Sequence, residues 1–272
     1  RGEFTELSGE VEMLGRIHSD IMFQDRFLPN KLPVKVKLLR SKDNFSLMAP
    51  AGTDYKVKIN EAMLFYRLVE VSDSVRVGLQ NALSLGPAKY PITRVQCKYF
   101  SIPTGLSSVN YENLFQGQMP TRIIVGLVDS AAFNGDFSKN PFNFQHKGVT
   151  NINLYIGGIP TPIKALTPIY PDQNLLSYMS VYTGTGKWAK DEGCGFDRRE
   201  HARGYCLYAW DLTADLSDGE NNFELLKSSG VRLELKFGAA LATTTNCIVY
   251  GEFQNMLMVD MHRQVTDNFG SS

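Results

Sequence analysis

Apolar and polar residues alternate with a period of two along much of the chain, which is the pattern of half-buried β-strands. Leu32, Val34, Val36 and Leu38 alternate mainly with lysines, and similar runs rich in β-branched and aromatic residues recur to the end of the chain. They predict strands over residues 32–38, 55–59, 63–71, 121–128, 151–156, 204–210, 231–237 and 247–259. Many short strands with few helices predict an all-β fold, a β-sandwich or jelly roll.

Helix signals are few. The best covers residues 74–85, with Ser72 or Ser74 as the N-cap and Gly86-Pro87 as the stop, and it places Val75 and Leu79 on one face. Residues 174–181 predict a second short helix. Four prolines crowd one connection, which we interpret as an extended loop rather than a central strand: Pro160, Pro162, Pro168 and Pro171.

Composition excludes several classes of protein. The 272 residues are 43% hydrophobic and 21% charged, which is too apolar for a disordered chain. The 28 basic and 28 acidic residues cancel, whereas a dedicated nucleic-acid binder needs a basic excess. Four cysteines are too few for a disulfide scaffold, and no apolar run approaches the roughly 20 residues of a membrane-spanning helix. The length allows one large domain or two small ones.

The sequence offers no catalytic or metal-binding motif. Cys194, His201 and Cys206 form the nearest approach to a cluster, but their spacing fits no zinc pattern, and we expect neither a metal nor a cofactor. The residues around Gly184 to Lys187 fail the phosphate-loop pattern because Trp188 follows the lysine. We therefore expect a protein that is not an enzyme.

One segment, residues 183–204, is rich in glycine and charge. It is either a solvated loop or a protruding interface loop, in which case the candidate contact residues are Trp188, Phe196, Arg198 and Arg199. A second charged stretch joins Lys35, Lys37, Arg40 and Lys42. It is either a solvated strand face, with lysines protecting a sheet edge, or a surface that faces packaged nucleic acid or an acidic partner.

Several long stretches carry a family resemblance. They are residues 15–20, 23–26, 37–45, 132–135, 139–144, 184–187 and 209–213, together with the run from Glu112-Asn113-Leu114-Phe115-Gln116-Gly117 to Arg122. These stretches resemble the hexon-like major capsid protein of Polinton/Maverick elements and the related adintoviruses, over nearly the whole chain. The resemblance implies a double jelly roll, of which three copies form a pseudo-hexagonal capsomer of an icosahedral shell. It carries no catalytic residues.

The resemblance and the strand count together give a domain hypothesis. Residues 1–71 are expected to be the later strands of a first jelly roll, residues 72–86 a linking helix, and residues 87–272 most of a second roll. The chain begins without Met, and we expect an upstream part of the same polypeptide to supply the missing strands. The expected partners are therefore further copies of the chain, that upstream part, and penton or minor capsid proteins.

The leading interpretation is a structural shell protein of a virion, assembled inside the host cell of a virus or a virus-like transposon. The alternative is a jelly-roll binding module, such as a minor capsid, vertex or glycan-binding attachment protein. In that case exposed aromatic residues would stack on sugars, and the candidates are Tyr170, Tyr178, Tyr182 and Trp188. The competing expectation for these rings is packing in the core or at subunit contacts.

Overall fold

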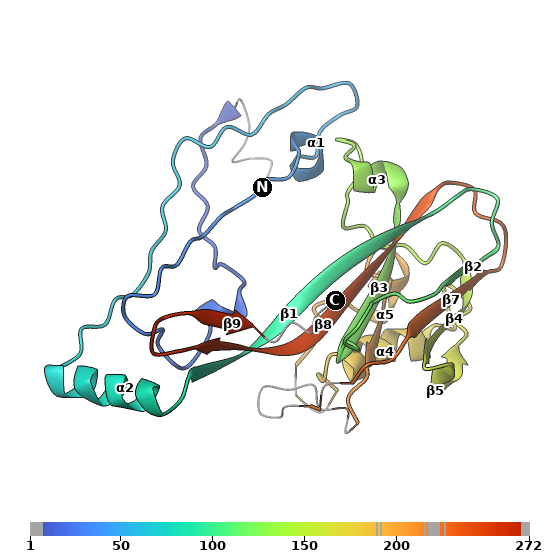
Figure 1. Cartoon of the computed structure of the whole chain (residues 1–272). Coiled ribbons are helices and arrows are strands. Elements are labelled where there is room, and N and C mark those ends of the chain that lie inside the picture. The colour runs from blue at the N-terminus through green and yellow to red at the C-terminus, as the bar shows by residue number, and fades with distance from the viewer. Residues whose placement is uncertain are drawn as a thin grey trace.

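The computed structural model describes residues 8–267, except 189, 191, 215, 217–223 and 226. Two antiparallel sheets form a sandwich (Figure 1). One sheet contains β1 (Ala88–Ile102), β8 (Thr245–Val259), β3 (Arg122–Asp129) and β6 (Leu207–Asp211) in that order, with β9 (Val265–Asp267) paired to β8. The other contains β2 (Ser108–Tyr111), β7 (Val231–Phe237), β4 (Val149–Ile156) and β5 (Ile159–Leu166).

The strand pairing defines a jelly roll. The first strand pairs with the eighth, the second with the seventh, the third with the sixth and the fourth with the fifth. This is the arrangement that results when one long antiparallel ribbon is rolled into two facing sheets, and it is the eight-stranded jelly-roll topology. The all-β, jelly-roll prediction is therefore confirmed for residues 88–259.

The core lies between the two sheets and is built from alternating positions. In β7 the side chains of Val231, Leu233, Leu235 and Phe237 are buried, while the polar residues between them face outward. From the opposite sheet, β3 contributes side chains such as Ile123 that are fully buried in the same cluster. The sequence predicted the β7 boundaries correctly because this strand has one apolar and one polar face.

The helices are more numerous than predicted. Helix α2 (Asp73–Leu85) and helix α4 (Leu175–Gly184) confirm the two predicted helices. The described residues also contain α1 (Asp43–Ser46), α3 (Ser130–Asn134), α5 (Arg198–Ala202) and a 3-10 turn η3 (Asp20–Met22). These additional helices of three to five residues are too short to give a periodic signal in the sequence.

Helix α4 packs against the outer face of the sheet at β6. Its last residue, Gly184, approaches the backbone of Ala209 so closely that an added Cβ atom would lie 2.6 Å from the Ala209 carbonyl carbon. The absence of a side chain is therefore required for this helix to lie flat on β6. Helix α2, in contrast, has no buried residue, so its predicted apolar face has no partner within the described chain.

The sequence missed several strands of this sandwich in different ways. Strands β1, β2 and β9 were not predicted. The connection containing Pro160 and Pro162 was predicted as a loop, but residues Ile159–Leu166 form β5. Strand β5 lies at the edge of its sheet, where a residue without an N–H group does not interrupt a ladder. The loop prediction was therefore wrong for β5, although the exclusion of a central strand was correct.

The described residues 8–71, called here the N-terminal arm, contain no strand. The strands predicted over 32–38, 55–59 and 63–71 are therefore not observed. Alternation marks a chain that suits a sheet, but a strand forms only where a neighbour completes the backbone ladder, and the described chain supplies none here. Figure 1 shows the arm beside the sandwich, in blue to cyan, leading into α2.

The arm touches the roll at three places. The Gln24 side chain donates to the Pro91 carbonyl at 2.6 Å, so residues around η3 cover the start of the β1 edge. The Asn44 side chain of α1 donates to the Gly135 carbonyl at 2.8 Å beside α3. The Arg263 side chain donates to the Asn30 carbonyl at 2.9 Å. Phe45 of α1 also packs edge-on against Phe142, with ring centroids 5.8 Å apart. These few contacts fix the arm while most of its apolar residues stay exposed.

Candidate functional site

The outer face of the sheet at β1 and β8 carries a group of neighbouring apolar side chains. Cys97 is paired with Tyr250, and Tyr99 with Ile248, so these side chains share one face of the sheet. Val95 and Tyr99 are 46% and 62% exposed. Helix α4 covers the same sheet only near β6 and β3. We call the residues Val95, Cys97, Tyr99, Ile248 and Tyr250 the β1–β8 outer face.

The middle of strand β1 places two charged residues on its inner face. Arg94 and Lys98 lie over the rings of Phe253 and Phe115 at 4.5 and 5.4 Å from the ring centroids. These cation–π contacts keep two charged side chains at the rim of the core, between the inward-facing apolar residues at the two ends of the strand. Val95, Cys97 and Tyr99 face outward from the same middle part, which favours an interface on this side.

The N-terminal arm adds further exposed apolar side chains. Its segments carry them on extended chain rather than on a packed element, and the most exposed are Met13, Leu14, Phe27, Leu38, Leu39, Met63, Phe65, Tyr66 and Leu68. Contiguous apolar surface of this kind marks contact sites in soluble proteins. The sequence signal for it was the alternation that predicted strands in the arm.

The basic residues of the arm lie on its surface. Lys35 and Lys37 are exposed, and the segment that carries them is not a strand. Arg40 forms a 2.6 Å ion pair with Asp43, and its hydrogen bond together with one from the Val57 N–H lowers the pKa of the Asp43 carboxyl. The described geometry therefore contains no sheet edge for these lysines to protect, and the nucleic-acid alternative stays a prediction.

The four predicted interface residues lie in different environments. Trp188 is 61% exposed, and Arg199 is exposed on α5. Phe196 is half-buried, stacked on Tyr205 with ring centroids 5.2 Å apart. Arg198 donates from Nε to the Asn174 side chain at 2.9 Å and also to the Asp172 carbonyl. Trp188 and Arg199 are thus accessible, whereas Phe196 and Arg198 hold the loop against its own protein.

Helix α5 gives the charged loop a fixed local structure. Asp197 accepts from the Glu200 N–H at 2.7 Å, and the Glu200 side chain accepts from the Asp197 N–H at 2.9 Å. This reciprocal pair is a capping box, which satisfies backbone groups at the start of the helix. The interpretation of residues 183–204 as a fully solvated loop is therefore wrong for its second half.

Aromatic rings pack beneath this loop. The Tyr170 hydroxyl lies 2.9 Å from the Tyr208 hydroxyl and 3.2 Å from Cys206 Sγ, and Tyr208 is fully buried. Burial raises the pKa of Tyr208 well above 10 and also raises the pKa of the Cys206 thiol. Neither group therefore ionises readily enough to be a nucleophile at neutral pH. The Tyr178 and Tyr182 hydroxyls are also hydrogen-bonded to each other at 2.8 Å. Of the four candidates for stacking on sugars, Trp188 is therefore the ring that is accessible to a ligand.

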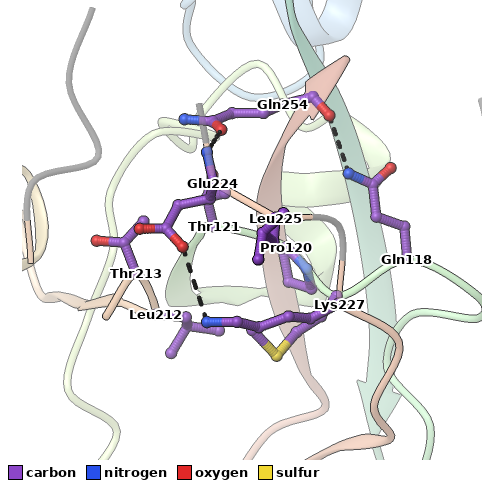
Figure 2. A pocket seen from close by; sticks show the side chains of 10 residues that line it. Gln118, Pro120, Thr121, Leu212, Thr213, Glu224, Leu225, Lys227 and Gln254 are labelled. Atoms are coloured by element: carbon purple, nitrogen blue, oxygen red, sulfur yellow. Dashed lines mark hydrogen bonds and ion pairs between the residues drawn. The ribbon is translucent and has the colours of Figure 1, made fainter. Parts of the chain in front are cut away.

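A shallow hollow with a volume of only about 20 Å³ lies between the residues shown in Figure 2. The Gln118 side chain donates to the Gln254 carbonyl at 2.9 Å, and the Gln254 side chain accepts from the Glu224 N–H at 2.8 Å. Glu224 also pairs with Lys227 at 3.7 Å. The polar groups of the hollow bind one another rather than converging on a common point, so the geometry does not define a catalytic site.

The described residues contain no cluster of metal ligands and no helix that could span a membrane. In the described parts of the chain, no three His, Cys, Asp or Glu residues gather as metal ligands would, and Cys194, His201 and Cys206 do not form such a group. All four cysteines are free thiols. The helices of the described chain are too short or too polar to cross a bilayer.

Comparison with known proteins gives one sequence relative. No family model matches the sequence. The uncharacterised protein F54H12.2 of Caenorhabditis elegans is 28% identical over 268 residues, which cover 94% of this chain and 62% of that protein. The chain thus spans less than two thirds of the length of this relative.

Comparison with solved structures gives viral capsid proteins. The chain is similar to VP54 of PBCV-1 with a TM-score of 0.47 and 10% identity, over 74% of this chain and 55% of that one. It is similar to a Sputnik virophage chain (TM-score 0.42, 13% identity, 68% and 39% covered). It is also similar to the mavirus major capsid protein (0.37, 9%, 67% and 41%). These values are low, so the jelly-roll assignment rests on the strand order and pairing described above.

Proposed function

We propose that the chain is a structural capsid protein of a virus or a virus-like transposon. The observation that carries this proposal is the group of exposed apolar side chains Val95, Cys97 and Tyr99, which the middle of strand β1 places on the outside of a jelly roll. A sandwich that functions alone gains nothing from an uncovered apolar face, whereas a shell subunit buries such a face against its neighbours. The resemblance of the sequence to the Polinton/Maverick and adintovirus capsid proteins supports the same role.

The proposed organisation is that of a hexon-like double jelly roll. Residues 87–272 form the second roll, residues 72–86 the linking helix, and residues 1–71 the later strands of the first roll. The support for the last assignment is that the arm alternates like a strand and exposes its apolar residues, as unpaired strands of an incomplete sandwich would. An upstream part of the polypeptide would supply the pairing strands.

Assembly proceeds, in this proposal, through closed trimers that tile an icosahedral shell with penton or minor capsid proteins at its vertices. The 28 positive and 28 negative residues support dense packing of identical copies, because a chain without net charge experiences little long-range repulsion from its neighbours. The chemistry proposed is assembly alone, with no enzymatic step and no cofactor, and the location is the virion shell.

Mass photometry and negative-stain electron microscopy of the full open reading frame test the proposal. The expected particles have three times the mass of one polypeptide and a pseudo-hexagonal outline, and at high concentration they form shells. A matched variant, Tyr99→Lys with Val95→Lys, should remain folded and lose the assembly because it charges the β1–β8 outer face. Monomers under all conditions, from a wild-type chain with a cooperative unfolding transition, would contradict a shell function.

The alternative function, a glycan-binding or attachment module, is supported by one observation. Trp188 is an exposed ring on the charged loop and offers a flat surface on which a sugar could stack. A glycan array probed with wild-type protein and with Trp188→Ala tests it. Wild-type binding that the variant loses would favour the alternative, and an array without hits would remove it.

A further inference from the structure

Two histidines meet one tyrosine under the charged loop. The His146 ring is stacked on the Tyr170 ring with centroids 4.3 Å apart and an interplanar angle of 12°. The His201 ring lies on the same tyrosine at 6.5 Å and 24°. His201 is fully buried, whereas His146 is half-buried. We call these three residues the His–Tyr–His cluster.

The surroundings of the cluster favour neutral imidazoles. Nδ1 of His146 accepts from the Gly148 N–H at 3.0 Å, so it carries no proton. Nε2 of His201 lies 3.0 Å from the Leu207 carbonyl and donates to it, a bond that the neutral ring and the imidazolium can both make. The His201 Nδ1 atom is buried and has no hydrogen-bond partner in the described structure, so a proton on it would be an unsatisfied buried donor.

The cluster joins three loops that are distant in sequence. His146 lies between α3 and β4, Tyr170 lies between β5 and α4, and His201 belongs to α5. The backbone reinforces the junction, because the Phe144 N–H donates to the Gly204 carbonyl at 2.8 Å. The Tyr170 hydroxyl adds its contacts with Cys206 and Tyr208. A change at the rings therefore affects all three loops together.

The charged and titratable groups around the rings give no compensation for a positive charge. Burial lowers the pKa of both rings, and the positive charge of Lys147 lowers the pKa of His146 further. For His201, the hydrogen bond to the Leu207 carbonyl raises the pKa and His146 lowers it, and burial makes the net direction downward. The other groups facing His201 are the phenols of Tyr170 and Tyr178, from the preceding loop and α4, and that of Tyr208 from β6. On α5 itself, the Glu200 carboxylate is engaged by the Asp197 N–H in the capping box.

We propose that the His–Tyr–His cluster is an acid-sensitive latch, which holds the charged loop and α5 on the roll while both imidazoles are neutral and releases them when the imidazoles are protonated. Protonation removes the acceptor that the Gly148 N–H uses and creates a buried donor at His201 Nδ1 with no acceptor. An imidazolium gains some attraction to the Tyr170 ring, but two imidazoliums beside one ring repel each other.

The lowered pKa values of His146 and His201 determine how the stability of the latch depends on pH. Both folded pKa values lie below the 6.5 of an unfolded histidine, so the latch is fully closed above pH 6.5. Its stability falls as the pH drops below 6.5 and through the folded values. Each pH unit in that window favours the open state roughly tenfold for each imidazole, because the open state binds the extra proton. This inference does not depend on capsid assembly, since it concerns the loops of a single roll.

Hydrogen exchange followed by mass spectrometry, with labelling times corrected for pH, tests the latch in the full chain. Between pH 7.5 and pH 5, peptides covering residues 167–174 and 196–206 should lose protection, while peptides from β7 and β8 should keep it. Nitrogen NMR of the wild-type rings gives an independent readout. It should show neutral imidazoles at pH 7.5 and titration below pH 6.5.

Substitutions that preserve the hydrogen bonds separate protonation from packing. His201→Gln retains a donor toward the Leu207 carbonyl, and His146→Asn retains an acceptor for the Gly148 N–H. The double variant should keep the protection of the loops at pH 7.5 and no longer lose it at pH 5. His18→Asn and His262→Gln, at exposed positions, are the matched controls and should leave the acid response unchanged. The latch is refuted by an acid response that persists in the double variant, or by wild-type rings that protonate while both loops stay protected.

Discussion

Arg122 of β3 and Glu252 of β8 lie directly opposite each other in the sheet and form a 2.7 Å ion pair whose side chains are only 14% and 16% exposed. Arg122 Nε also donates to the Gly184 carbonyl at 2.7 Å, so the pair connects the sheet to the end of α4. It is the best-shielded charge pair that the described structure contains, and it lies where the uncovered part of the sheet meets the covered part.

Glu252→Gln should destabilise the roll by about 1.5–3 kcal/mol, because a shielded guanidinium loses its charged acceptor. Urea unfolding followed by the fluorescence of Trp210, which is buried in the core, measures the change. Asp54→Asn is the control, since the Lys56–Asp54 pair is 72% and 85% exposed. Equal effects of the two substitutions would show that the shielding of the Arg122–Glu252 pair has no energetic weight.

Gly184→Ala should destabilise the roll by about 1–3 kcal/mol, the usual cost of overpacking, because the new Cβ would lie against the Ala209 backbone, which cannot rotate away. Thermal unfolding gives the measurement. Gly78→Ala in α2 is a matched control in which an added Cβ meets nothing within 4 Å. It should be neutral or stabilise α2 by up to about 1 kcal/mol. If both substitutions behave alike, α4 does not lie on β6 as described.

Leu233→Ala should cost about 2–5 kcal/mol, because Leu233 is fully buried in the core and the cavity is closed on both sides by sheets. Ile163→Ala in β5 is the control, with a side chain that is 89% exposed, and it should change the free energy of unfolding by less than about 0.5 kcal/mol. Urea titrations of both variants provide the comparison. If Leu233→Ala lowered the free energy of unfolding only slightly, β7 would not belong to the core.

The four thiols should react in a defined order with a thiol reagent. Cys97 is exposed and should react first, although partial burial raises its pKa and slows the reaction near neutral pH. Cys247 is fully buried with its pKa raised to about 12, and it should react only after unfolding, as should Cys206. The reaction of Cys97 should accelerate as the pH rises because only the thiolate attacks.

The reactivity of Cys97 also tests whether the β1–β8 outer face is buried on assembly. Cys97 belongs to the β1–β8 outer face, so assembled particles should protect it, whereas Cys194 of the charged loop is the internal reference. Mass spectrometry of labelled peptides distinguishes the two. Equal labelling of Cys97 in assembled and unassembled protein would exclude this face from the subunit contact.

The strands that the sequence predicted well have one apolar face toward the core and one polar face toward solvent. Val231 to Phe237 alternate apolar inward and polar outward, and the predicted and observed boundaries agree. Strand β1 was missed because its alternation changes phase along the strand. Ile92 and Ile102 face inward near its ends, whereas Arg94 and Lys98 face inward in its middle, where Val95, Cys97 and Tyr99 face outward. No rule based on one buried and one solvated face detects a strand with that arrangement.

Tertiary contacts account for what the sequence did not predict at the candidate site. Arg198 was identified as an interface residue because it lies in a charged loop, yet its hydrogen bond to Asn174 depends on the placement of α4. The convergence of His146 and His201 on Tyr170 joins three loops and has no local signature. In the arm, the alternation was real, but strand formation depends on a partner that local sequence does not specify.

The buried cluster of the sandwich draws its members from Ile102 to Phe253, so the arm contributes nothing to it. We therefore expect the core of the roll to form without help from the arm, which is held to it only by surface contacts such as the Gln24–Pro91 hydrogen bond. If the arm belongs to a first jelly roll as proposed, its strands would form only when the pairing strands cover it. Folding and assembly would then be a single event for the arm and two events for the roll.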